Sequence, residues 1–140
     1  MARRKEKDQP SKDAEQLLAA VVKDRGDDII ILIVPSHGGG HPQIELPDKD
    51  QWADAALQLF GRLYRGATAF ETFQGIWISD DGKELFDKPV FIESLVNRED
   101  AENVGKLEEL VAFAQRMCRE TKQECVAIIC NDTIHFVRGK

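Results

Sequence analysis

The chain has 140 residues, of which 42% are hydrophobic and 31% are charged, and its formal net charge at pH 7 is −6. These values are typical of one globular domain, and the longest apolar run, IIILIV, is far shorter than the ~20 residues that a membrane span needs. A transmembrane protein is therefore excluded. The acidic charge also makes binding to nucleic acid unfavourable, because phosphates attract clustered Lys and Arg side chains.

The N-terminal segment differs from the rest in charge. Residues 1–12 carry five basic and two acidic side chains, and they lack the apolar stretch of a secretory signal. We expect residues 1–12 to be a disordered basic tail, residues 13–140 to form a single α+β domain, and the protein to be cytoplasmic. Ser11 can cap a first helix that ends near Arg25, before Gly26.

A strand and a histidine-glycine segment come next. Residues 28–34, DIIILIV, are β-branched without polar alternation, which predicts a central strand covered on both faces. The SHGGGH segment that follows has two interpretations. His37 and His41, with Asp80 of a later hairpin, have the side chains of a zinc or iron site. The favoured interpretation is a mobile surface loop without a metal, because three glycines give it no stiffness.

The middle of the chain predicts a helix and two strands. A helix beginning after Asp48 or Asp50 carries an apolar stripe from Trp52 to Leu63 and ends at Gly66. Residues 67–79 and 89–96 then read as two strands of one hairpin, in which Asp81 and Gly82 form the turn. Gly75 marks a bulge or a close packing contact.

The last third predicts one long helix and a hairpin. The helix runs from about Glu99 to Arg119, with an apolar stripe at Val104, Leu107, Val111, Ala114 and Cys118. Two strands follow, joined at Asn131 and Asp132. The resulting pattern, β-α-β-β-α-β with one extra strand, predicts an α+β fold of the ferredoxin-like two-layer sandwich type with a leading N-terminal helix. Both later helices lie on one face of the sheet, so the leading helix or a second subunit covers the other.

This topology also predicts where a site would lie. The first strand ends at Pro35, and the hairpin tip, the turn after the long helix and the chain end are expected at the same end of the sheet. The candidate ligand-binding or partner-binding residues there are Ser36, His37, His41, Asp80, Asp81, Glu120, Thr121, Gln123 and Arg138.

Two further sets of side chains, thiols and aromatic rings, have the chemistry of a catalytic or binding site. The spacing of the three cysteines is not that of a metal site, which predicts reduced thiols in the core at Cys118, Cys125 and Cys130. His135 is expected opposite about residue 128, near neither the Cys125 nor the Cys130 sulfur. Phe73 and Trp77 could stack on bases, but the acidic residues around them favour core packing or a dimer surface.

Residues of about 50–130 resemble a group of small, functionally uncharacterised bacterial proteins. The shared pattern is LY-x-GATA, then G-x-W, then DD-x-G, and here it falls on Gly66, Ala67, Thr68, Gly75, Trp77, Asp80, Gly82 and Gln123. The resemblance implies a shared fold and transfers no activity.

No complete catalytic constellation is present in the sequence. We therefore expect a non-enzymatic interaction domain that acts through protein contacts and forms a homodimer, with no cofactor, no membrane association and no nucleic acid. The alternative is a metal-dependent enzyme that uses His37 and His41.

Overall fold

The computed structural model describes residues 11–21, 26–38, 41–45 and 48–139, and of residues 41–45 only the backbone is described. The helices and strands are α1 (Lys12–Val21), β1 (Asp28–Val34), β2 (His37–Gly38), β3 (His41–Glu45), α2 (Lys49–Tyr64), β4 (Thr68–Glu71), β5 (Gly75–Ile78), β6 (Glu84–Asp87), β7 (Val90–Val96), α3 (Arg98–Ala101), α4 (Val104–Glu120), β8 (Val126–Cys130) and β9 (Thr133–Val137). Residues 1–10 of the predicted tail lie outside the described residues.

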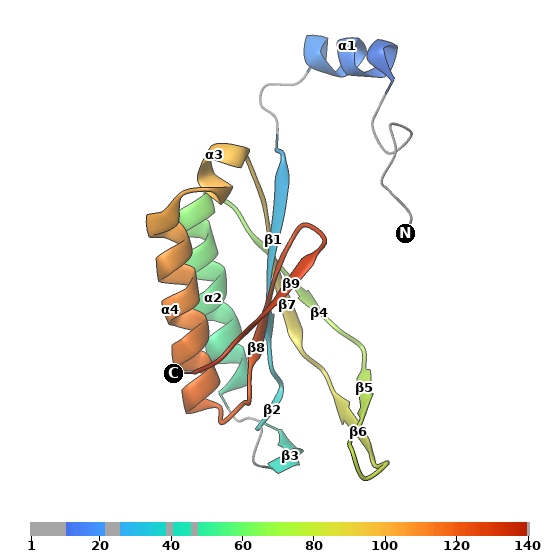
Figure 1. The fold of residues 1–140 in the computed structure, drawn as a ribbon, viewed down its shortest axis with the longest axis vertical. Helices are drawn as coiled ribbons and strands as arrows, with labels where there is room; N and C mark the ends of the chain where they lie inside the picture. Colours follow the sequence, from blue (N-terminus) through green and yellow to red (C-terminus); the bar gives the residue numbers. More distant parts are fainter. Residues whose placement is uncertain (1–10, 22–25, 39–40, 46–47, 140) are drawn as a thin grey trace.

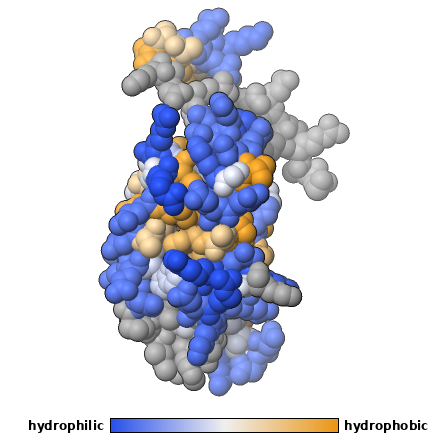
Figure 2. Space-filling model, turned by 90° about the vertical axis from the view of Figure 1, so that its left-hand side faces the viewer, coloured by the Kyte–Doolittle hydropathy of each residue, from blue (hydrophilic) through white to orange (hydrophobic). Residues whose placement is uncertain are grey.

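The fold is a mixed α+β arrangement around one antiparallel sheet. Five strands pair in the order β4-β7-β1-β8-β9, and α2 and α4 lie side by side against one face (Figure 1). The core forms where the two helices meet the sheet, and its fully covered side chains include Leu32, Phe60, Ile92, Leu110 and Met117. Most of the visible surface on the side that carries the two helices is hydrophilic (Figure 2).

The central strand is covered on one face and not on two as predicted. Ile30, Leu32 and Val34 are buried against the helices, whereas Ile29 is 40% exposed and Ile31 and Ile33 are only partly covered. The second set of side chains faces the open side of the sheet because successive residues of a strand point to opposite faces.

The leading helix does not cover this open face. The α1 helix starts as predicted, since the Ala14 N–H lies 3.2 Å from the Ser11 hydroxyl oxygen. None of its residues is buried, and it stands apart from the sheet (Figure 1). Its apolar side chains remain exposed, including Leu17 and Val21. Residues 22–25, which include the predicted helix end, lie outside the described residues.

The long hairpin predicted for residues 67–96 is divided into two parts. β4 pairs with β7 in the main sheet, while β5 and β6 form a separate two-stranded arm that projects from it (Figure 1). The break falls at Thr72, whose hydroxyl donates to the Pro89 carbonyl oxygen at 2.7 Å. Pro89 has no N–H to continue a strand ladder, which explains why both strands are interrupted at the same level.

The long helix of the last third is also divided. Asn97 caps α3 and Asn103 caps α4, each accepting a hydrogen bond from the backbone N–H three residues later. Asn side chains favour helix N-caps, so the second Asn restarts the helix. The buried stripe of α4 is Leu110, Ala114, Met117 and Cys118, which differs from the predicted stripe because Val104 and Leu107 remain exposed.

The end of α2 and the glycine-rich segment also differ from the prediction. The α2 helix ends at Tyr64, and its C-cap is Arg65, which takes a left-handed φ of 69° one residue before the predicted Gly66. The glycine-rich segment is not wholly a loop, because β2 and β3 pair on either side of residues 39–40, which are outside the described residues.

Within the part of the chain that the structure describes, no helix is long and apolar enough to cross a membrane.

Candidate functional site

Residues at the end of β1 gather as predicted around Ser36. The Ser36 side chain is 1% exposed, and its hydroxyl oxygen accepts a hydrogen bond from the Lys88 N–H at 2.7 Å. The same hydroxyl lies 2.7 Å from Nδ1 of His37. Ser36 therefore ties the end of β1 to the connection between β6 and β7, and it fixes the His37 ring beside that connection.

Gln123 reaches the same place from the turn after α4. Its side-chain amide donates to the His37 carbonyl oxygen, and its own N–H donates to the Cys118 carbonyl oxygen at 2.9 Å. The turn is tight because Lys122 takes a left-handed φ of 57°. The sequence thus correctly placed Ser36, His37 and Gln123 at one end of the sheet.

The other predicted residues have different surroundings. Thr121 is buried, and its hydroxyl donates to the Met117 carbonyl oxygen at 2.6 Å, which completes the end of α4. Glu120 pairs with Arg116 at 3.5 Å. Asp80 and Asp81 lie at the exposed turn of the β5–β6 arm, where a hydrogen bond from Ser79 holds the pKa of Asp81 below its usual value.

Arg138 and His41 complete the predicted set. Arg138 is exposed after the end of β9. The His41 side chain, the predicted metal-binding partner of His37, lies outside the described residues. Among the side chains that the structure describes, no group of three His, Cys, Asp or Glu residues comes together to hold a metal ion.

An apolar hollow of about 600 Å³ lies next to this cluster, on the open face of the sheet. We call it the aromatic hollow, and its lining residues are Ile33, Pro35, Gly75, Ile76, Trp77, Asp87, Pro89, Phe91, Cys125, Val126, Ala127 and Phe136. Trp77 and Phe136 are 53% and 67% exposed, so two aromatic side chains are available to a ligand. A hollow of this size is within the range of small-molecule sites.

A polar end adjoins the aromatic hollow. A smaller pocket shares Pro35, Trp77 and Asp87 with it and adds His37 and Gln123. The shared walls mean that a ligand stacked on the aromatic side chains has a carboxylate and an amide within reach at one end.

Sequence reasoning missed the role of Asp87. The strand register places Asp87 opposite Gly75, and a Cβ added at Gly75 would lie 2.5 Å from a carboxylate oxygen of Asp87. Gly75 is therefore the close contact that the sequence predicted, and it lets the carboxylate lie over the backbone of β5. A glycine inside a strand pattern was the available signal, but it did not identify the partner.

The thiols of Cys118 and Cys130 are not activated nucleophiles. Burial raises the pKa of Cys118 and of Cys130, so both stay protonated at neutral pH. His135 pairs opposite Ile128, as the sequence predicted. These observations favour a packing role for Cys118 and Cys130.

The comparisons with known proteins concern the fold. No family model and no curated protein matches the sequence. A solved structure of a phage SAM lyase in complex with S-methyl-5'-thioadenosine is similar over 84% of this chain and 95% of that one, with a TM-score of 0.54 and 16% identity. A phage SAM lyase in the apo state is similar over the same shares, with a TM-score of 0.57 and 14% identity.

These similarities correct the expected function. The sequence predicted a non-enzymatic interaction domain, with a histidine metal enzyme as the alternative. The prediction of a non-enzymatic domain is wrong, because the fold of this chain is similar to the fold of an enzyme. The sequence argument rested on the absence of a catalytic motif, and residues that separate strands bring together leave no local motif in any sequence.

Proposed function

We propose that this protein is an enzyme that binds a positively charged nucleoside of the S-adenosylmethionine (SAM) type in the aromatic hollow. The observation that carries the proposal is the exposed Trp77 and Phe136 lining one apolar hollow that also contains Asp87. The strand order β4-β7-β1-β8, with both helices on one face, supports a ferredoxin-like scaffold for this site.

The chemistry of the hollow matches the two parts of such a ligand. A purine ring stacks on aromatic side chains, and each stacked base contributes about 1–3 kcal/mol to binding. A sulfonium ion is a soft cation, which the face of an indole ring attracts as it attracts quaternary ammonium groups. The carboxylate of Asp87 and the net charge of −6 add a long-range attraction for a cation.

A lyase reaction of SAM fits an apolar hollow. The bond between the sulfonium sulfur and the side-chain carbon of the amino acid breaks, and its electron pair stays on sulfur to give neutral S-methyl-5'-thioadenosine. The carboxylate of the same amino acid attacks that carbon and forms the C–O bond of a lactone as the C–S bond breaks, so neither water nor a proton acceptor is needed. In this proposal, Trp77 and Phe136 hold the nucleoside, and Asp87 and Gln123 orient the polar groups at the end of the hollow.

The test measures binding and turnover separately. Calorimetry should detect S-methyl-5'-thioadenosine binding, and chromatography should detect its release from SAM. Trp77→Ala should weaken binding by about tenfold or more, since it removes the stacking surface. Phe73→Ala is the control, because Phe73 is 90% exposed and does not line the hollow. Unchanged affinity in Trp77→Ala, or no binding of either compound, would contradict the proposal.

We further propose that a second copy of the chain covers the rest of the open sheet face. Strand register places apolar side chains next to one another on that face: Ile29, Ile31, Leu95, Ile129 and Ile134. Leu95 is 68% exposed and Ile134 is 53% exposed, and contiguous apolar surface of this kind marks interaction sites.

The solution mass tests this pairing. Light scattering should give twice the chain mass of 15.8 kDa. Leu95→Lys should return the protein to the monomer mass, because it places a charge within the apolar surface. Leu107→Lys, on the opposite side of the sheet in α4, is the control and should leave the dimer intact. A wild-type protein that is monomeric at high concentration would refute the pairing.

A further inference from the structure

The smaller pocket at the polar end of the aromatic hollow has a volume of about 90 Å³, and we call it the polar pocket. Its polar side chains are His37, Asp87 and Gln123. Trp77 lines the polar pocket and the aromatic hollow alike, so a ring stacked on Trp77 can place a substituent in the polar pocket. Among the described residues that line these two spaces, only Asp87 is an Asp, Glu, Lys or Arg. The polar pocket therefore recognises a ligand with one carboxylate, one imidazole and one amide.

Ser36 fixes which ring nitrogen of His37 carries a hydrogen. The Ser36 hydroxyl oxygen accepts the Lys88 N–H at 2.7 Å, and among the described residues the hydroxyl proton has one acceptor, Nδ1 of His37 at 2.7 Å. Ser36 is 1% exposed, so without that acceptor its proton would be buried and unpaired, which is unfavourable. In the neutral imidazole the hydrogen is therefore on Nε2. A protonated imidazole also carries a hydrogen on Nε2, so Nε2 is a donor in either state.

This donor and the Asp87 carboxylate are not used within the part of the chain that the structure describes. Nε2 of His37 makes no hydrogen bond there, and no Lys or Arg side chain pairs with Asp87. Gly75 leaves room for the carboxylate, because a Cβ at that position would lie 2.5 Å from one of its oxygens. The Gln123 amide nitrogen already donates to the carbonyl oxygens of His37 and Thr121. The donor that remains for a ligand is therefore Nε2 of His37.

These groups match two neighbouring hydroxyls better than any charged group. A phosphate or a carboxylate would be repelled by Asp87, and no Lys or Arg of the described residues lines the polar pocket to offset this repulsion. An ammonium group would pair with Asp87 but would leave the His37 N–H without an acceptor. A hydroxyl both donates and accepts, so two hydroxyls on adjacent carbons satisfy the carboxylate and the N–H together. Dinucleotide-binding folds also hold a ribose hydroxyl with a carboxylate.

We propose that the polar pocket holds the ribose of the nucleoside, with its 2'- and 3'-hydroxyls donating to Asp87 and one of them accepting from Nε2 of His37. This inference rests on the proposed function, since it is the base stacked on Trp77 that brings the ribose to the polar pocket. It adds a reason for the site to select a ribonucleoside over a deoxyribonucleoside.

Calorimetry with adenosine, 2'-deoxyadenosine and 3'-deoxyadenosine tests the proposal, because the three compounds share the base and differ by one hydroxyl. Adenosine should bind, and each deoxy compound should bind about tenfold more weakly or less than that. Equal affinity of the three would overturn this inference and leave the proposed stacking on Trp77 intact. No binding of adenosine would also overturn it, and the titration with S-methyl-5'-thioadenosine then decides whether the proposed function fails as well.

Three variants test the residues through the ratio of the adenosine affinity to the deoxyadenosine affinities, which a mere loss of stability would not change. Asp87→Asn should bring the three compounds to within a factor of about two. His37→Leu should lower the ratio for one of the two deoxy compounds, and His37→Gln, which restores an N–H donor, should recover part of it. His135→Leu is the control, since His135 is exposed on β9 and lines neither space. An unchanged ratio in Asp87→Asn would overturn the proposal.

Discussion

Replacing Phe60 by Ala should lower the free energy of unfolding by about 3–5 kcal/mol, because Phe60 has no exposed surface and lies in the core between α2 and the sheet. Its ring also meets the Tyr64 ring edge to face, with 5.9 Å between their centres. Urea denaturation followed by far-UV circular dichroism measures the loss. The melting temperature should fall by roughly 10–20 °C.

Two further variants separate the loss of core packing from other effects of the substitution. Phe73→Ala removes the same ring from a side chain that is 90% exposed, and it should change stability by less than about 0.5 kcal/mol. If Phe60→Ala does not fold at all, Phe60→Leu should still fold, with a loss of about 1.5 kcal/mol or less. Equal stability of Phe60→Ala and Phe73→Ala would mean that α2 packs by another face.

Replacing Asp28 by Ala should lower the free energy of unfolding by about 1–3 kcal/mol at pH 7, because it removes hydrogen bonds to a buried charged group. The loss stays below that of a fully buried ion pair, because the Arg98 side chain is 59% exposed and remains hydrated. Urea denaturation of both proteins measures this difference, and Asp54→Ala on the exposed side of α2 is the control.

The contribution of Asp28 should also depend on pH. Hydrogen bonds from Asn131, and then from Arg98, hold the pKa of Asp28 below 3.8 in the folded protein. The unfolded chain therefore takes up the proton first as the pH falls, so the stabilisation is complete above about pH 5 and is lost progressively as the pH falls through the folded pKa. The difference between wild type and Asp28→Ala should shrink between pH 5 and about pH 3. A constant difference would mean that the charge of Asp28 contributes nothing.

The order of helices and strands could be predicted from local sequence. The IIILIV run, the Trp52 stripe and the hairpin at Asn131 each depend on residues close in the chain. The interruptions at Thr72 and before Asn103 were missed, because each depends on a contact or a cap that competes with an otherwise continuous pattern.

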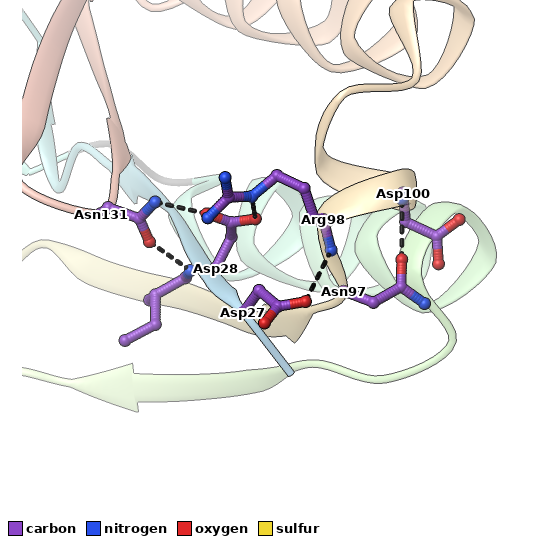
Figure 3. Close-up of polar contacts among 7 residues, drawn as sticks. Asp27, Asp28, Asn97, Arg98, Asp100 and Asn131 are labelled. Carbon is purple, nitrogen blue, oxygen red and sulfur yellow. Dashed lines mark hydrogen bonds and ion pairs between the residues drawn. The ribbon is translucent and has the colours of Figure 1, made fainter. Parts of the chain in front are cut away.

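The sites were harder to predict than the fold. Ser36, His37 and Gln123 were found because strand direction alone brings them to one end of the sheet. The ion pair between Asp28 and Arg98 (Figure 3) was missed, since the two residues are far apart in sequence and form no motif. One signal was available: Asp28 shares its strand face with Ile30 and Leu32, and an acid on a buried face requires a partner.

The position of β1 sets the order in which the chain can fold during synthesis. β1 is the first strand made, yet its partners β7 and β8 are made only after α2, β4, β5 and β6, and contacts this distant in sequence slow folding. At about 5–20 residues per second on the ribosome, the IIILIV strand waits for seconds before either neighbour exists. During that time its unpaired edges are exposed to other chains, so overexpression should make newly synthesised protein dependent on chaperones that bind short apolar strands.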